Sequence, residues 1–161
     1  MSPQRSIAYI SSVFVFALFA ALAPAQERPS YGPAITLATA KKIAAAALAE
    51  AEKNKWSVAI AIVDNHGALV YYECMDDTQS ASPVIAIEKA RSAAMFRRST
   101  RVMEDTVNKG RVSFLGIPLA TPITGGLPIT AGGKIVGGIG VSGMTSDQDE
   151  QIAKAGLEGL K

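Results

Sequence analysis

The sequence predicts a small α+β domain with a central antiparallel sheet of about five strands, flanked by helices, in a profilin-like or PAS-like shape. Two observations lead to this prediction. Pairs of short apolar segments on either side of a tight turn occur at 57–74 and again at 127–141, and each pair is typical of a β-hairpin. Segments with helical spacing of apolar residues precede, separate and follow the hairpins, whereas a doubly wound sheet requires strands that alternate with helices.

The composition fits one globular domain and excludes several kinds of site. The chain has 161 residues, of which 48% are hydrophobic, so it can build a packed core. Its single cysteine excludes an internal disulfide, and its single histidine excludes a zinc site built on several imidazoles. A formal net charge of +2 gives no sign of the basic surface that nucleic-acid binding requires, so we expect no nucleic-acid partner.

The first 25 residues have the pattern of a signal peptide. An uncharged apolar segment at 7–22 follows Arg5, and small residues stand at alternate positions in Ala23-Pro24-Ala25. A membrane anchor is the alternative, but 16 apolar residues fall short of the roughly 20 that span a bilayer. We therefore predict a signal peptide over 1–25, cleavage after Ala25, and export to the periplasm or the extracellular space.

Residues 26–35 contain two prolines and a glycine without periodicity, which predicts a flexible leader before a domain over 36–161. Thr36 can cap a helix, because apolar residues then recur at helical spacing as far as the polar residues 53–55. Two β-rich segments follow, at 57–64 and 68–74, around the turn Asn65-His66-Gly67. They predict the first hairpin.

The second half of the chain predicts two more helices, the second hairpin and a terminal helix. Ser82 and Pro83 can begin a helix that runs to about Arg98, and a shorter helix is expected over 101–108. The second hairpin turns at Gly132-Gly133. Thr145 or Ser146 then caps a terminal helix with acidic residues in its first turn, where their negative charge interacts favourably with the helix dipole.

A glycine-rich segment resembles a nucleotide-binding fingerprint without its context. Gly138, Gly140 and Gly143 match Gly-x-Gly-x-x-Gly after a predicted strand. The fingerprint also requires a second parallel strand that ends in an acidic residue about 20 positions later, and only 18 residues follow Gly143. We attribute these glycines instead to sheet packing, a bulge, or the approach of a ligand to bare backbone.

His66 is the only histidine and lies in the turn of the first hairpin. A turn residue commonly faces solvent, but a neutral imidazole also binds haem iron well, and one axial ligand is sufficient for such a site. His66 is therefore a candidate haem ligand as well as an ordinary turn residue. Methionine sulfur is a softer alternative at four positions that equally suit core filling: Met75, Met95, Met103 and Met144.

Lys89 lies mid-helix among apolar residues, where a lysine commonly extends along the edge of a core. Its alternative role is a cation at the mouth of a pocket, facing a carboxylate or a haem propionate. Asp64, Asp76 and Asp77 are acid or base candidates, although turns and loops favour aspartate for backbone reasons alone. The chain contains no specific catalytic constellation.

Five segments follow one another along the chain at compatible distances: 61–69 (AIVDNHGAL), 75–76 (MD), 85–96 (IAIEKARSAAMF), 125–129 (GGLPI) and 137–153 (GGIGVSGMTSDQDEQIA). Together they resemble the GlcG/HbpS family, and also the C-terminal domain of PduO-type proteins. The resemblance covers about Leu37 to Leu160 and implies an α+β fold, haem binding, homo-oligomers and, for exported members, a membrane sensor as partner. The candidate cofactor-binding residues are His66, Lys89, Phe96, Gly125 and Gly126, with His66 as the candidate metal ligand.

The sequence therefore favours an exported haem-binding protein that sequesters, carries or senses haem. Two alternatives stay open. One is an enzyme that acts on a small carboxylated metabolite in a glycine-lined pocket, with Lys89 as its cation. The other is a non-catalytic oligomeric interaction module.

Overall fold

The computed structural model describes residues 28–160, so the predicted signal peptide lies outside the described residues. Four α-helices, four strands and one 3-10 helix follow one another along this part of the chain. Within it, no helix has the length and apolar character needed to cross a membrane. The order is α1 (Leu37–Asn54), β1 (Ala59–Asp64), β2 (Leu69–Cys74), α2 (Ser82–Phe96), α3 (Thr100–Asn108), η1 (Val112–Gly116), β3 (Gly126–Ala131), β4 (Lys134–Ser142) and α4 (Ser146–Glu158).

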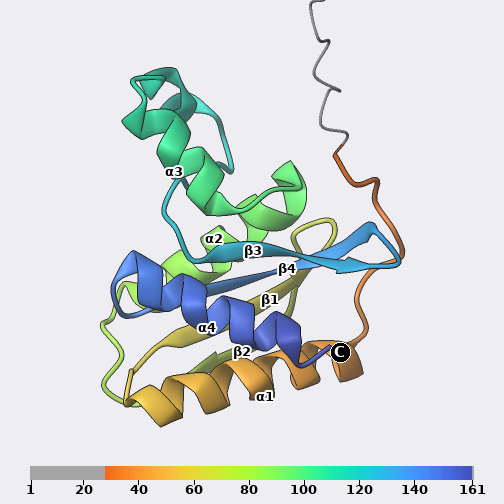
Figure 1. Ribbon diagram of the computed structural model, residues 1–161, viewed down its shortest axis with the longest axis vertical. Helices are drawn as coiled ribbons and strands as arrows, with labels where there is room; N and C mark the ends of the chain where they lie inside the picture. The colour runs from red at the N-terminus through yellow and green to blue at the C-terminus, as the bar shows by residue number, and fades with distance from the viewer. Residues whose placement is uncertain (1–27, 161) are drawn as a thin grey trace, which may run out of the picture.

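The strands form one antiparallel sheet in the order β2-β1-β4-β3 (Figure 1). Both predicted hairpins are present, as β1–β2 and β3–β4. The central pairing of β1 with β4 joins them, with Ala61 opposite Gly140. The α+β fold is thus confirmed, with four strands where about five were expected.

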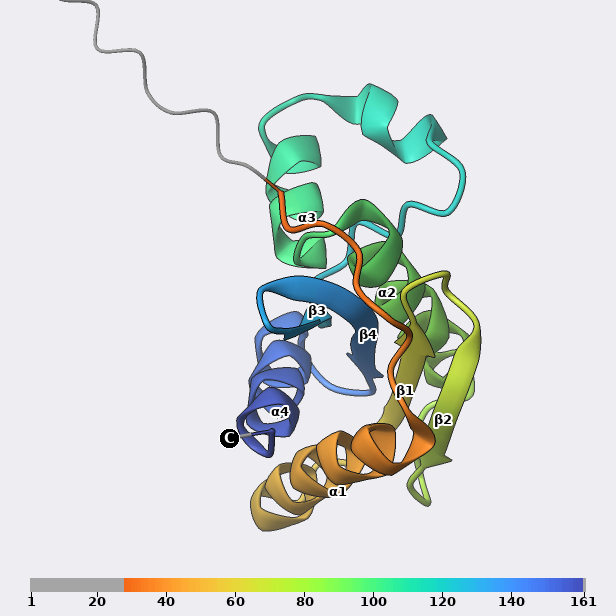
Figure 2. The same ribbon diagram turned by 90° about the vertical axis from the view of Figure 1, so that its right-hand side faces the viewer.

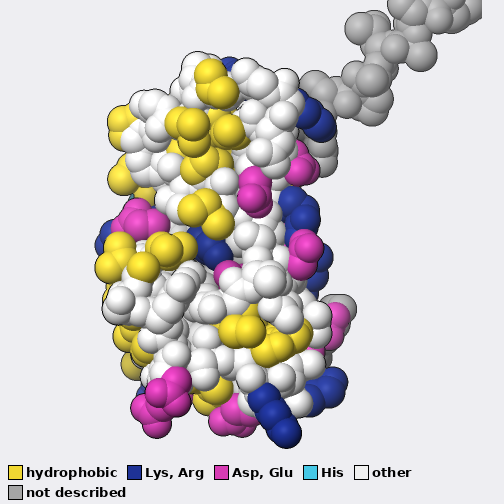
Figure 3. All heavy atoms as spheres, turned by 90° about the vertical axis from the view of Figure 1, so that its left-hand side faces the viewer, with side chains coloured by type: hydrophobic (Ala, Val, Ile, Leu, Met, Phe, Trp, Pro, Cys, Tyr) yellow, Lys and Arg dark blue, Asp and Glu magenta, His cyan; other side chains and the backbone are white. Residues whose placement is uncertain are grey.

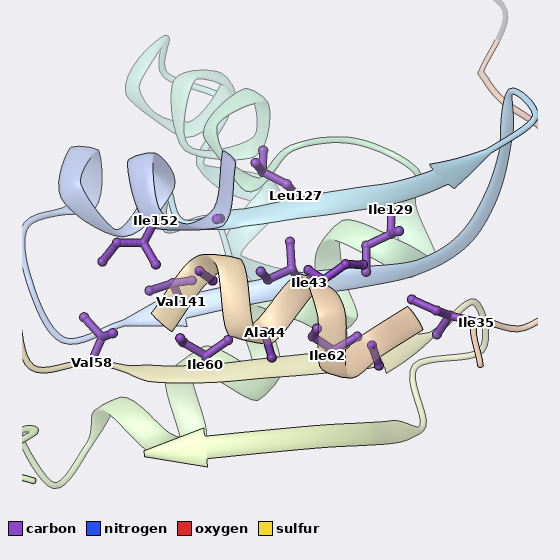
Figure 4. Packing of buried hydrophobic residues seen from close by; sticks show 14 of the residues in the cluster. Ile35, Ile43, Ala44, Val58, Ile60, Ile62, Leu127, Ile129, Val141 and Ile152 are labelled. Atoms are coloured by element: carbon purple, nitrogen blue, oxygen red, sulfur yellow. The ribbon is translucent and has the colours of Figure 1, made fainter. Parts of the chain in front are cut away.

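Helices cover both faces of the sheet. Helices α1 and α4 pack on one face and α2 packs on the other, while α3 and η1 project beyond the sheet (Figure 2). On the first face, Ile43 of α1, Ile60 of β1, Val141 of β4 and Ile152 of α4 point into a common core (Figure 4). The apolar stripes of both helices and one face of every central strand are buried there, which is the main source of stability for such a fold.

On the second face, small residues let α2 lie unusually close to the strands. The contact consists mainly of alanines on β1 and α2. A Cβ atom added to Gly140 would clash with the carbonyl oxygen of Ala86, and one added to Gly138 would clash with that of Ala90. Close helix packing therefore explains Gly138 and Gly140, and their backbone on this face is covered by α2.

Residues 30–35 differ from the predicted flexible leader, because they are held along the start of β4. Gly32 N donates to Ile135 O at 2.8 Å, and Ile135 N donates to Ser30 O at 2.8 Å. Ile35 is buried in the main core. The ordered domain therefore begins several residues before Thr36.

Helix ends follow the predicted caps in two cases and depart from them in one. The Thr36 hydroxyl accepts from Thr39 N at 3.2 Å, and Thr145 forms a capping box with Gln148. Ser82 does not cap α2: it is buried inside the first turn, and its hydroxyl accepts a hydrogen bond from Ser142 at 3.3 Å. The 3-10 helix η1 was not predicted.

Candidate functional site

Three of the predicted site residues meet in the interior. Lys89 of α2 is 1% exposed, and its Nζ donates to Val141 O at 2.9 Å and to Asp149 Oδ2 at 2.8 Å. Gly125 and Gly126 lie against it, since a Cβ at Gly125 would stand 2.8 Å from Lys89 Nζ. Both hydrogen bonds of this ammonium go to protein, so Lys89 ties α2 to β4 and α4 instead of presenting a cation to a ligand.

Asp149 is the partner that sequence reasoning missed. It lies in the first turn of α4, where we expected acidic residues to act on the helix dipole, but its side chain is only 3% exposed. Burial raises the pKa of the Asp149 carboxyl, and this rise is offset in part by Lys89 and by the backbone amides of Met144 and Gly143. No local sequence signal separates a buried aspartate in a first turn from an exposed one.

The first hairpin turn places His66 at the surface. Asp64 Oδ1 accepts from His66 N at 2.8 Å and from Ala68 N at 2.9 Å, which shapes the turn. Gly67 has φ 85°, and a Cβ there would approach Met95 Sδ to 2.9 Å. Asp64 thus has a backbone role, and the turn brings the histidine next to the end of α2.

Tyr31, Asn65, His66 and Met95 line a cavity of about 270 Å³, which we call the turn pocket. Tyr31 comes from the segment before α1, Asn65 and His66 from the hairpin turn, and Met95 from the last turn of α2. The Tyr31 hydroxyl donates to Met95 O at 2.6 Å, and Asn65 Nδ2 donates to Gly32 O at 2.7 Å. These bonds hold the three segments together around the pocket.

Asn65 carries an unsatisfied atom. The residue is 7% exposed, and Oδ1 has no hydrogen-bond partner among the described residues. A buried acceptor without a partner costs about 1–3 kcal/mol, so such an atom beside a pocket points to a donor that a ligand or water supplies.

The donor set of the turn pocket fits haem. Imidazole and thioether are both axial ligands of haem iron, and His66 and Met95 supply one of each. Of the four methionines considered from sequence, Met95 is the one that shares a pocket with His66. Among the described residues, no group of three or more His, Cys, Asp or Glu could hold a metal ion by itself.

Phe96, the remaining predicted residue, does not line the turn pocket. It follows Met95 directly and faces η1, where its ring and that of Phe114 lie 6.4 Å apart. Arg97 comes next and places its guanidinium carbon 5.2 Å from the centre of the Tyr31 ring. Of the predicted residues, His66 is the one at the turn pocket, while Lys89, Gly125 and Gly126 are packed in the interior.

A larger cavity of about 460 Å³ lies between α1, α3 and α4. Both of its basic residues are already paired: Arg101 with Asp147 at 2.5 Å and with Glu150 at 3.0 Å, and Lys154 with Glu150 at 2.6 Å. The remaining charged residues of its lining are acidic, so the cavity does not suit a ligand with carboxylates. The turn pocket is therefore the better candidate.

Comparison with known proteins places the chain in a family. The model for "Haem degrading protein HbpS-like" matches residues 35–158. Protein GlcG of Escherichia coli (strain K12) is 47% identical over 103 residues, which cover 64% of this chain and 77% of that protein.

Two crystal structures are similar to the whole domain. One, of HbpS, has a TM-score of 0.76 at 33% identity and covers 82% of this chain and 94% of that chain. The other, a complex of PduOC with haem, has a TM-score of 0.72 at 25% identity and covers 78% of this chain and 94% of that chain. The family model, the GlcG relative and these two structures agree with the resemblance seen in the sequence, and the chain belongs to the HbpS-like family of haem degrading proteins.

Proposed function

We propose that this protein binds haem in the turn pocket, with His66 as an axial ligand and Met95 as a second donor. The observation that carries the proposal is the convergence of the only histidine and a methionine on one pocket. The aromatic ring of Tyr31 supports it, since it offers an apolar surface to a flat ligand. Family membership and the similarity to a haem complex support the same ligand.

Within this proposal, each residue has a defined task. Bound haem would supply the redox chemistry of its iron. His66 would hold the iron from an exposed turn that Asp64 fixes through two backbone amides. Tyr31 fixes the end of α2, which carries the thioether, through Met95 O.

The test is a titration of the purified protein with hemin, followed by absorbance. We expect a saturable shift of the Soret band, a large loss of affinity in His66→Ala, and an altered spectrum in Met95→Leu. Met144→Leu is the matched control, because Met144 lies exposed in the loop before α4. A hemin spectrum that shifts without saturation, or one that His66→Ala leaves unchanged, refutes the proposed site.

The proposal extends to export: residues 1–25 act as a signal peptide, and the protein sequesters, carries or senses haem outside the cytoplasm. The uncharged segment at 7–22 and the Ala-Pro-Ala sequence support this. Cell fractionation and N-terminal sequencing test it, and the expected first residue is Gln26. Recovery of an uncleaved chain in the cytoplasm contradicts it.

A second proposed property is assembly into a homo-oligomer. We propose that a membrane sensor protein binds this oligomer. Exposed apolar side chains favour it, because they gather over the region of α3 and η1 (Figure 3). Size-exclusion chromatography with light scattering tests the assembly, and a monomer at high concentration contradicts it. The residues concerned are Val102, Val112, Leu115, Ile117, Leu119 and Ile123.

A further inference from the structure

We propose that Arg28, Arg97, Arg98 and Arg111, which we call the arginine cluster, form an anion site for the carboxylates of the ligand in the turn pocket. For haem these carboxylates are the two propionates, so the inference rests on the proposed function. The arginine cluster is distinct from the residues proposed to hold the iron.

Three segments bring the arginine cluster together. Arg97 and Arg98 follow the last residue of α2. Arg97 Nη1 donates to Pro29 O at 3.3 Å, so the backbone next to Arg28 lies beside the end of α2. Figure 2 shows the segment before α1 passing the end of α2.

Arg111 lies at the start of η1, which packs near the end of α2. The contact between the Phe96 and Phe114 rings, at 6.4 Å, packs η1 against the end of α2. Arg111 immediately precedes η1, and Phe96 immediately precedes Arg97. Arg111 therefore approaches the end of α2 from a separate part of the chain, close enough for its charge to act on Arg98.

The positive charge of the arginine cluster is not neutralised within residues 28–160. None of its four members takes part in the ion pairs of this part of the chain, which are Lys53–Glu50, Lys89–Asp149, Arg91–Glu88, Arg101–Asp147, Arg101–Glu150 and Lys154–Glu150. Arg98 is half-buried, and burial followed by the charges of Arg28, Arg111 and Arg97 lowers its pKa. A bound anion would relieve this repulsion.

The helix dipole explains only part of this arrangement. Basic residues are favoured after the C-terminus of a helix, which accounts for Arg97 and Arg98 but not for Arg28 or Arg111. Arg97 is also the C-cap of α2 at φ 54°, a backbone conformation that glycine adopts without strain. An arginine there costs stability and supplies a guanidinium at the rim of the turn pocket.

The arginine cluster adjoins the turn pocket through Tyr31. Arg97 stacks on the Tyr31 ring at 5.2 Å, and the same tyrosine lines the pocket. The pocket volume of about 270 Å³ lies below the range of roughly 300–1,000 Å³ that is usual for sites of drug-sized ligands. A macrocycle that starts at His66 must therefore extend past the rim, and guanidinium groups there can bind its carboxylates in the bidentate manner.

The experiment compares three porphyrin probes: hemin, metal-free protoporphyrin IX, and the dimethyl ester of protoporphyrin IX, which lacks free carboxylates. Binding is measured by fluorescence or absorbance in the full chain and in Arg98→Gln and Arg111→Gln. Lys41→Gln is the matched control, because it removes one exposed positive charge from α1 on the opposite face of the sheet. Circular dichroism confirms that each variant is folded.

We expect each arginine variant to lose about tenfold in affinity for hemin and for metal-free protoporphyrin alike. The ester should bind the wild type more weakly than the free acid and should be insensitive to both variants. His66→Ala should weaken hemin alone, so iron ligation and carboxylate binding are read separately. Lys41→Gln should match the wild type with every probe.

Two results overturn the inference. The first is that the free acid and the ester bind with equal affinity and that both arginine variants bind as the wild type does. If hemin still binds the wild type saturably in that case, the proposed function stands without the arginine cluster. The other is a site that binds inorganic phosphate in an Arg98-dependent way while phosphate fails to displace the porphyrin acid. A third outcome separates the two proposals. If hemin shows no iron ligation but metal-free porphyrin still binds through its carboxylates, the iron site is refuted and the arginine cluster is supported.

Discussion

Replacing Lys89 by methionine should lower the free energy of unfolding by about 3–5 kcal/mol at pH 7, because it leaves the Asp149 carboxylate buried without its cation. The two side chains are only 2% and 3% exposed, so water cannot take the place of the ammonium. Methionine is unbranched and adaptable, so it fills most of the space that the buried lysine side chain occupies. The loss therefore measures the uncompensated charge.

The sign of the pH dependence follows from the Asp149 pKa. Burial already raises this pKa, and removal of Lys89 raises it further. A carboxyl group whose pKa is higher in the folded than in the unfolded chain binds more protons when folded. Its neutral form thus stabilises the fold at low pH, and this stability is lost as the pH rises through the folded pKa. The destabilisation of Lys89→Met should be smaller at pH 5 than at pH 7.

Urea unfolding followed by circular dichroism at the two pH values is the assay. The double variant Lys89→Met, Asp149→Asn serves as the control, because it removes both charges and should recover most of the lost stability at pH 7. The reasoning is refuted if Lys89→Met loses less than about 1 kcal/mol at pH 7, or if the double variant is no more stable than the single one.

Two further variants probe the packing of α2 and the ion pairs of α4. Gly140→Ala should lower the free energy of unfolding by about 3 kcal/mol, because the new Cβ would clash with the Ala86 carbonyl. In the control Gly116→Ala the new Cβ meets nothing within 4 Å, so the free energy of unfolding should change by no more than about 0.5 kcal/mol. The midpoints of urea unfolding compare the two variants. Burial opposes ionisation of Glu150, but Arg101 and Lys154 lower its pKa on balance. The charged form of Glu150 therefore stabilises the fold at neutral pH. This contribution is lost as the pH falls through the lowered pKa. Glu150→Gln should therefore lose about 1–2 kcal/mol at pH 7 and less at pH 3 in the same assay, and equal losses at both would contradict this.

Most elements could be predicted from local patterns. The turn residues at 65–67 and 132–133 marked both hairpins, and the hydroxyls of Thr36 and Thr145 marked two helix starts correctly. These features depend on residues a few positions apart, so the sequence contains them directly. Ser82 failed as a cap because tertiary packing buries it against Ser142.

The candidate site was less accessible to such reasoning. The sequence pointed to His66 through its chemistry and its uniqueness, and Met95 was one of four equivalent sulfur candidates. Tyr31 lay in a segment that we expected to be flexible, since no periodicity marks a strand bridge to Ile135. Only the hydrogen bonds of residues 30–35 to β4 bring this tyrosine to the turn pocket.

By itself, the sequence determined the α+β class, the two hairpins, most of the helix boundaries and the family. The tertiary structure decided which chemically capable residues are available to a ligand. The sequence allowed Lys89 to be the cation of a pocket, but its ammonium is buried and paired with Asp149, 60 positions away. His66 instead shares a cavity with Met95, which lies on a separate helix. Contacts of this range depend on how α2 packs on the sheet, and side-chain periodicity specifies which face of a helix is buried but not which residue it meets.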